Sequence, residues 1–289
     1  MAGLARNGAG GAGRIARAVI DAVRRFNDQG GFVRSSHVAM SMMLALFPFI
    51  LFVVALAGAV SRDIDRARLI EFFFGVWPDD IAAPIVSEIQ AVLAADSVQL
   101  MTIGGVLALY FASNGVDAVR VALSYAYRDD DPRPFWKTRL LCVVFVLAGG
   151  AVALFAVTVG FGIPAYFRLV AETMPDFLVT WAHSPVMQSA VSLGILTIAV
   201  AACHLWLPGT PHGLRQTWPG VLLTVVLWVA AVWMFSYYVA YFADYSATYA
   251  GLAGAMAALI FLYLMAAILI FGAEFNGALI RRKSAAAGT

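Results

Sequence analysis

Charged residues are scarce in this chain of 289 residues. Asp, Glu, Lys and Arg make up 12% of it, whereas a typical soluble domain carries about 25%. Hydrophobic residues reach 62%, more than the interior of a globule of this size would hide. This composition excludes a soluble fold, intrinsic disorder and a collagen-like rod. The net charge of +2 also argues against a nucleic-acid-binding protein, which would carry a concentrated basic face.

Residue patterns that usually carry chemistry are missing as well. Cys142 and Cys203 fall within apolar runs and have no Cys or His neighbour at a redox or zinc-binding spacing. The four histidines form no HxH or HExxH pattern, and no Walker A sequence, dinucleotide-binding glycine loop or GxSxG elbow occurs. We therefore predict that the chain is not an enzyme, with no catalytic residues, no cofactor, no metal site and no ATP-driven pumping of its own.

Long intervals between charged residues dominate the sequence. A helix that crosses the hydrocarbon core needs about 20 apolar residues, because the core is about 30 Å thick and each residue rises about 1.5 Å. Six intervals qualify, and they predict an all-α, polytopic membrane protein with six transmembrane helices. The expected spans are about residues 37–60, 98–118, 140–163, 187–207, 218–240 and 249–273.

The distribution of basic residues predicts the orientation. Fifteen Lys and Arg residues lie in the alternate segments that include both termini, and four lie in the others. By the positive-inside rule both termini are cytoplasmic. The expected organisation is a cytoplasmic tail over residues 1–30, a membrane domain over 31–280 and a short cytoplasmic tail over 281–289. The first tail contains a basic amphipathic helix over residues 14–26, which would lie either on an anionic leaflet or against the helix bundle.

Polar side chains in or beside the spans are candidates for function, because they are costly in hydrocarbon. Asn114 and Asp117 end the second span and Glu274 and Asn276 end the sixth, so all four are expected near the cytoplasmic surface. There they would pair with nearby arginines or line a polar pathway. Pro48 predicts a kink in the first span. The turn between the last two spans would form an aromatic belt or bind a polar headgroup or glycan through Tyr241, Asp244, Tyr245, Ser246, Thr248 and Tyr249.

A set of segments stands out along the sequence: Ala39–Leu56 with Phe47-Pro48, Ala122–Tyr127, Arg133–Lys137, Trp218-Pro219-Gly220, Tyr245–Tyr249 and Gly272–Asn276. Together they resemble the YihY/BrkB family of bacterial inner-membrane proteins, which was once labelled as a ribonuclease family. The resemblance covers roughly residues 30–280, and the chain departs from the family pattern at Ser124 and Ala250. It implies a role in the cell envelope, serum resistance, or lipid or solute export, and it brings no established chemistry.

These observations favour a transporter, or a translocase of lipids or envelope components, in the bacterial inner (plasma) membrane. Its polar route would run from the turn at residues 245–249 toward Asn114 and Glu274. The alternative is a non-catalytic membrane scaffold for envelope assembly, and a ribonuclease is less favoured than either. The expected partners are membrane lipids and a lipid-linked or small-solute substrate, with no nucleic acid, and a homo-oligomer is compatible with the sequence.

Overall fold

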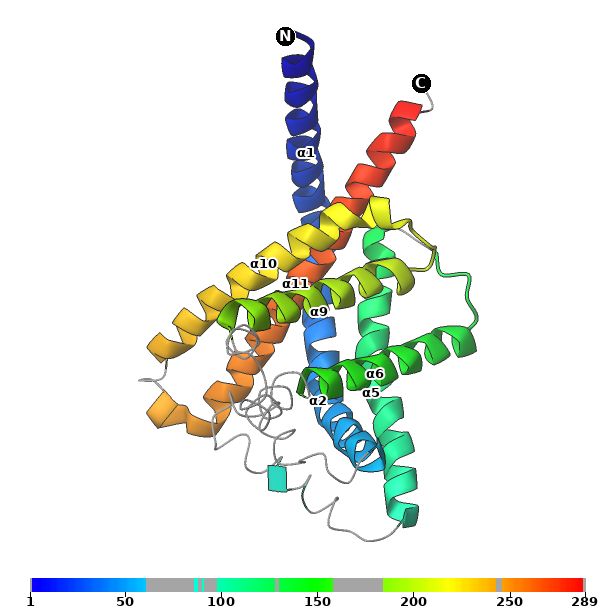
Figure 1. The fold of residues 1–289 in the computed structure, drawn as a ribbon, viewed down its shortest axis with the longest axis vertical. Coiled ribbons are helices and arrows are strands. Elements are labelled where there is room, and N and C mark those ends of the chain that lie inside the picture. Colours follow the sequence, from blue (N-terminus) through cyan, green and yellow to red (C-terminus); the bar gives the residue numbers. More distant parts are fainter. Residues whose placement is uncertain are drawn as a thin grey trace, which may run out of the picture.

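A computed structural model describes residues 2–60, 86–87, 90, 98–127, 130–157, 184–242 and 246–287. Within these ranges the chain is all-α, as predicted, and no β-strand occurs in them (Figure 1). The helices found there are α1 (Ala2–Asp28), α2 (Gly31–Val60), α5 (Val98–Tyr127), α6 (Phe135–Val157), α9 (Pro185–Trp206), α10 (Leu214–Phe242) and α11 (Ser246–Ala287).

Five of these helices are long and apolar enough to cross a membrane. They correspond to the second to sixth expected spans, whereas the first, residues 37–60, lies in α2, whose side chains are described only in part. The count of six therefore stays a prediction. The two chain ends lie on the same side of the helix bundle (Figure 1), as an even number of spans requires. The five membrane-length segments are Gly105–Tyr127, Phe135–Phe155, Ser189–Trp206, Leu214–Tyr238 and Met256–Arg282.

Local sequence explains where several helices begin. Ser184 caps α9, because its side chain accepts a hydrogen bond from the Met187 backbone N–H at 3.2 Å, and Pro185 occupies the first helical position. Gly30 has a φ of +68°, a left-handed conformation that favours glycine and turns the chain from α1 into α2. Pro48 lies inside α2, which is helical on both sides of it. The kink at Pro48 stays a prediction.

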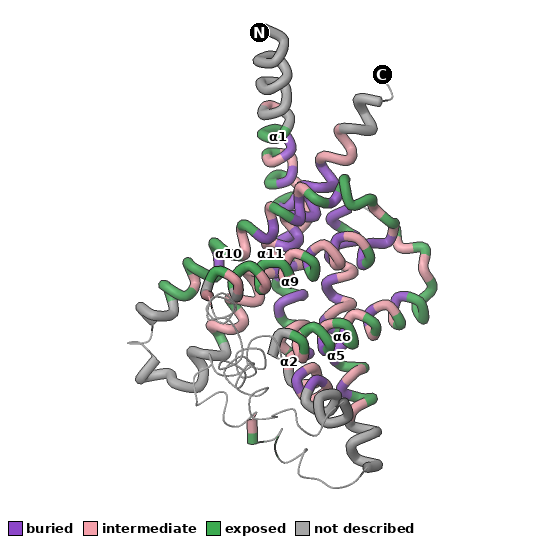
Figure 2. The backbone as a smooth tube through the Cα atoms, in the orientation of Figure 1, coloured by how far each residue is buried: buried purple, intermediate pink, exposed green. Residues whose placement is uncertain are grey.

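Helix α11 lies at the centre of the packing. It contacts α1, α2, α5 and α10, and the buried backbone in Figure 2 is concentrated where these helices meet. Leu123 of α5, Val221 of α10 and Ala273 of α11 are fully buried in this core. The outer faces instead expose large apolar side chains, including Ile198 at 71% and Trp233 at 78%. Such faces fit a lipid environment, because lipid tails replace the protein core as their apolar neighbour.

The basic helix α1 packs on the bundle. Ala18 and Ala22 are fully buried and belong to one cluster with Phe275 of α11. Asp21 accepts hydrogen bonds from Arg282 at 2.5 and 2.9 Å, which adds an ion pair to the same contact. Of the two placements expected for the amphipathic helix, the structure therefore has the one against the bundle.

Candidate functional site

A buried polar cluster joins α5, α9, α10 and α11. We call it the Asn276 cluster, and it consists of Tyr127, His204, Thr217, Gly220 and Asn276. Asn276 is fully buried, and its Nδ2 donates to the Thr217 carbonyl at 2.8 Å and to the Tyr127 hydroxyl at 2.9 Å. Its Oδ1 accepts the Gly220 N–H at 2.7 Å. Both donor hydrogens and one acceptor position of the amide are therefore used, which fixes its orientation.

The sequence around Pro219 explains why Asn276 binds at this place. Proline has no N–H, so α10 loses one backbone hydrogen bond there, and the carbonyl four residues earlier has no helical donor. Asn276 bonds to backbone groups on both sides of this interruption. It approaches closely because Gly220 faces Gly272 of α11, and a Cβ on Gly220 would overlap the Gly272 carbonyl and Asn276 itself. The Pro-Gly step of α10 and the glycine of α11 thus create one buried crossing.

Tyr127 extends this cluster to α9. Its hydroxyl lies 2.8 Å from Nδ1 of His204, which is fully buried. Because the hydroxyl oxygen already accepts from Asn276, its hydrogen is available to donate to Nδ1, and the histidine proton then sits on Nε2. The Nε2 atom is buried and makes no hydrogen bond among the described residues. The His212 ring stacks on Tyr127 with 4.4 Å between ring centroids. Four helices are thus connected by one hydrogen-bonded chain.

Glu274 is also buried, with 1% of its surface exposed. It lies two residues before Asn276 on the same helix, about 200° around the axis, so the two side chains face different directions. Both residues were expected near the cytoplasmic surface, at the end of the sixth span. The structure buries both, because α11 continues to Ala287 and is covered by neighbouring helices over this stretch.

Asn114 and Asp117 occupy a different part of α5. Asn114 is exposed, and its Oδ1 accepts a hydrogen bond from Arg139 at 2.8 Å. Asp117 pairs with Arg120, whose Nε lies 2.8 Å from the carboxylate, so one expected carboxylate–arginine pair is present. Asn114 precedes Tyr127 by 13 residues, about 20 Å along the helix. The structure therefore does not bring Asn114 into the Asn276 cluster.

Asp131 holds a second polar centre, outside the membrane-length segments. Its carboxylate accepts two hydrogen bonds from the Arg133 guanidinium, at 2.7 and 2.8 Å, one from the Arg133 backbone N–H at 3.1 Å and one from Arg120 at 2.5 Å. The hydrogen bond from Arg133 is the main cause that lowers the pKa of Asp131 to about 2. Arg133 also donates to the Leu207 carbonyl at 2.8 Å. We call Arg120, Asp131 and Arg133 the Asp131 clasp, because they fasten α5 to the end of α9.

The predicted polar turn between the last two spans stays untested. Asp244 and Tyr245 lie outside the described residues. Tyr241 lies in α10, and Ser246, Thr248 and Tyr249 lie in α11, but the described side chains do not include theirs. Across the described part of the chain, no group of three or more His, Cys, Asp and Glu side chains is placed to hold a metal ion.

Tyr127, His204 and Thr217 were not predicted as site residues. A signal for His204 was present, because it lies within the fourth expected span and a histidine in an apolar span is as unusual as Asn276 in the sixth. Tyr127 ends one of the segments that carry the family resemblance, but nothing local marks its partner. Thr217 contributes its backbone carbonyl, which no side-chain pattern would reveal.

Comparison with known proteins gives consistent matches along the chain. The family model described as "Virulence factor BrkB" matches residues 22–289. The putative ribonuclease-like protein YfkH of Bacillus subtilis is 28% identical over 270 residues, covering 90% of this chain and 94% of that protein. A UPF0761 membrane protein of Alteromonas mediterranea is 22% identical over 255 residues, covering 88% of this chain and 84% of that protein. No solved structure matches the chain.

Proposed function

The chain belongs to the BrkB family of multi-pass bacterial membrane proteins, and from this premise we propose that it is a transporter or a translocase of lipids or envelope components. The observation that carries the proposal is the Asn276 cluster. Polar side chains inside a membrane bundle are costly and mark functional positions by default. Here they connect four helices at the point where α10 is interrupted by Pro219.

The hydrogen bonds of the Asn276 cluster are weak enough to break during a conformational change of α10. Hydrogen bonds between membrane helices contribute about 0.6 kcal/mol each on average. The bonds from Asn276 and Tyr127 therefore total only a few kcal/mol, so that a bound substrate would supply enough free energy to break them. A rigid anchor would gain as much from apolar packing alone. These small energies support a hinge in α10 at Pro219. We call Asn276 the latch of this hinge, because its hydrogen bonds to Thr217 and Gly220 would hold α10 in one conformation.

Glu274 adds a coupling group to this proposal. It is a carboxylate with 1% exposure in the helix that carries the latch, and burial of a charge is expensive unless the charge is compensated. Uptake or release of a proton at Glu274 would change that cost and would bias α11 between two arrangements. In this scheme the substrate passes along α10 and α11, and the candidate residues Tyr241 to Tyr249 line one end of the path.

Reconstitution tests the proposal directly. The full chain is placed in liposomes that contain phospholipids with a fluorescent headgroup, and the transfer of the fluorescent lipid between leaflets is measured by chemical quenching from outside. The wild type should accelerate transfer, and Glu274→Gln should slow it at least tenfold. Asp130→Asn, which neutralises an exposed carboxylate, should leave the rate unchanged. A Glu274→Gln variant as fast as wild type would refute the coupling role.

A membrane scaffold is the second candidate, and a surface groove favours it. A groove of about 670 Å³ lies beside α1 and is lined in part by Val19, Ile20, Val23 and Phe32. Ile20 and Val23 are more than half exposed although they belong to a helix packed on the bundle. Such an apolar face would bind another envelope protein. If the intact protein moves no tested lipid or solute in liposomes, the scaffold becomes the better assignment.

A further inference from the structure

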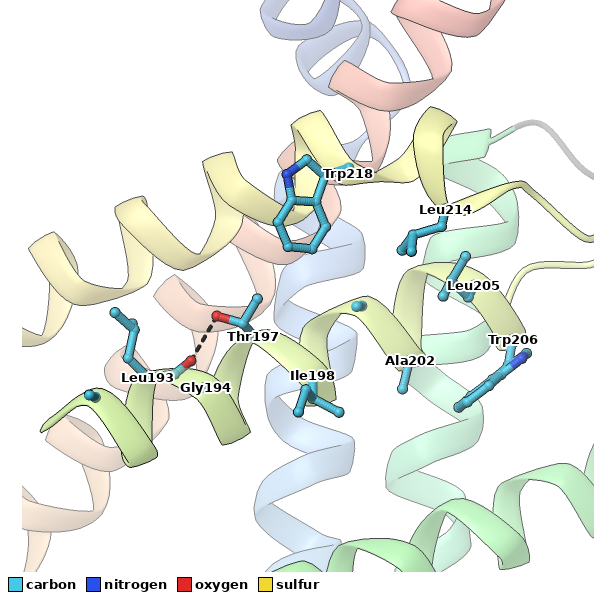
Figure 3. A pocket seen from close by; sticks show the side chains of 11 residues that line it. Leu193, Gly194, Thr197, Ile198, Ala202, Leu205, Trp206, Leu214 and Trp218 are labelled. Carbon is cyan, nitrogen blue, oxygen red and sulfur yellow. Dashed lines mark hydrogen bonds between the residues drawn. The ribbon is translucent and has the colours of Figure 1, made fainter. Parts of the chain in front are cut away.

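A second groove lies between α9 and α10, and none of the residues that line it belongs to the Asn276 cluster. It has a volume of about 680 Å³, and its lining includes Gly194, Thr197 and Trp206 of α9 with Leu214 and Trp218 of α10. Figure 3 shows Leu214 and Trp218 pointing from α10 toward α9. Small residues hollow the α9 side, and a Cβ on Gly194 would meet no other atom within 4 Å. There is therefore empty space in the groove beside Gly194.

The lining is almost entirely apolar, and its side-chain polar groups are the indole N–H groups of Trp206 and Trp218 and the hydroxyl of Thr197. Thr197 is the one residue with a hydroxyl among those that line the groove, and its Oγ1 donates to the Leu193 carbonyl of its own helix at 2.7 Å (Figure 3). Because the hydroxyl of Thr197 is used in this bond, its methyl group is what an occupant of the groove would contact. An apolar groove on a membrane helix must be filled by apolar material, because water does not occupy such a site favourably.

The groove is elongated along α9, which suits an extended apolar chain. Its α9 lining runs from Ala190 to Trp206, which is 16 residues or about 24 Å along the helix axis. A volume of about 680 Å³ spread over that length makes the groove long and narrow. An extended hydrocarbon chain fits, and the groove exceeds the roughly 15 Å depth of one leaflet.

One end of the groove carries the features of a membrane interface. Trp206 and Trp218 are 62% and 46% exposed and flank the loop between the two helices, and tryptophan is typical of the headgroup level. Arg215 follows Leu214 directly, and its side chain is exposed. We propose that the groove binds one acyl chain of an anionic phospholipid whose phosphate contacts Arg215. This inference does not rest on transport, since a tightly held lipid would serve a scaffold equally well.

Tryptophan quenching tests the site in the intact protein. The full chain is placed in phosphatidylcholine nanodiscs with increasing amounts of phosphatidylglycerol that carries brominated acyl chains. The Trp218 contribution is the difference in quenching between wild type and Trp218→Phe. It should saturate at a low mole fraction of brominated lipid. Replacement of Arg215 by Gln should reduce the preference over brominated phosphatidylcholine about fivefold, the effect of roughly one basic residue at a membrane surface.

Filling the groove provides the decisive comparison. Gly194→Leu places a side chain in open space and should raise the half-saturating lipid fraction at least tenfold. Gly105→Leu is the matched control, because a Cβ on Gly105 of α5 also meets nothing within 4 Å, and it should behave as wild type. Thr197→Leu fills the same groove one turn away and gives an independent test if Gly194→Leu does not fold.

Several outcomes would overturn the proposal. Quenching that rises in proportion to brominated lipid and is the same in all variants would show ordinary annular lipid. Equal quenching by the two headgroups with no effect of Arg215→Gln would remove the anionic specificity. If Gly194→Leu separated a cross-linkable dimer without changing Trp218 quenching, a second copy would be the occupant.

Discussion

Replacement of Asn276 by leucine tests whether the buried cluster holds the membrane bundle together. Leucine has a similar shape but neither donates nor accepts a hydrogen bond. The substitution removes the bonds to the Thr217 carbonyl, the Tyr127 hydroxyl and the Gly220 N–H at once. It also leaves these backbone groups beside Pro219, where α10 already lacks one hydrogen bond.

The magnitude follows from these three bonds. At about 0.6 kcal/mol each in a membrane bundle, they contribute about 2 kcal/mol to the free energy of unfolding. A buried backbone group left without a partner costs about 1–3 kcal/mol more. Here that group is the Gly220 N–H, because its partner, the Asn276 side chain, is fully buried. We therefore expect Asn276→Leu to lower the unfolding free energy by about 3–5 kcal/mol.

Titration with a denaturing detergent in mixed micelles, followed by far-ultraviolet circular dichroism, measures this loss. Asn114→Leu is the matched control, because Asn114 is exposed and its side chain bonds to Arg139 at the surface, so its loss should cost below about 1 kcal/mol. Combining Asn276→Leu with Tyr127→Phe should cost less than the sum of the two changes, since they remove a shared bond. An Asn276→Leu cost equal to that of Asn114→Leu, with additive effects for the pair, would refute the reasoning.

Three further predictions follow from the packing and the charges. Gly220→Ala should lower the unfolding free energy by at least about 2 kcal/mol, because the added Cβ overlaps α11. Gly194→Ala should be neutral or stabilising by up to about 1 kcal/mol, because its Cβ meets no atom. Equal effects of the two variants in the same detergent titration would contradict the close crossing of α10 and α11. The pKa of Asp131 is lowered to about 2 from its ordinary value of 3.8, so its carboxylate stabilises the fold above pH 3.8, and this contribution disappears as the pH falls toward 2. The difference in melting temperature between wild type and Asp131→Asn should therefore shrink as the pH falls from 4 to 2. A difference between the two proteins that changed mainly between pH 5 and 8 would contradict this assignment. Asp21→Asn removes an ion pair with Arg282 whose side chains are about one-third exposed. It should therefore lower the unfolding free energy by less than about 1 kcal/mol and leave α1 packed on the bundle. If a protease cleaved α1 of the variant more than about fivefold faster than in wild type, the ion pair would be what holds α1 in place.

The helices could be predicted well because their cause is local. A charge-free run in lipid must satisfy its backbone within itself, so the runs over 98–118 and 218–240 became α5 and α10. The ends were predicted less well, since the sixth run was expected to stop at residue 273 while α11 continues to Ala287. Arginines beyond the run do not end a helix, because they extend to water or to a partner, as Arg282 does to Asp21.

Prediction of the site was partial for a different reason. Asn276 and Glu274 stood out because polar residues are rare in apolar runs, and the structure buries both. Their surroundings were not predictable, because the partners of Asn276 lie 56 and 149 residues away along the chain. The expected route toward Asn114 and Glu274 stays a prediction, and the structure gives Asn114 an arginine of α6 as its partner, which is one of the two alternatives expected for it.

Sequence alone therefore determined the class of this protein, its membrane-length helices and the polar residues that hydrocarbon would not tolerate, since hydropathy and chain length act on each segment separately. The tertiary structure decided which of those residues meet. Asn276 reaches α10 only because Gly220 and Gly272 let two backbones approach at the position where Pro219 leaves α10 short of a hydrogen bond. That choice depends on steric fit between distant segments, which no single segment encodes.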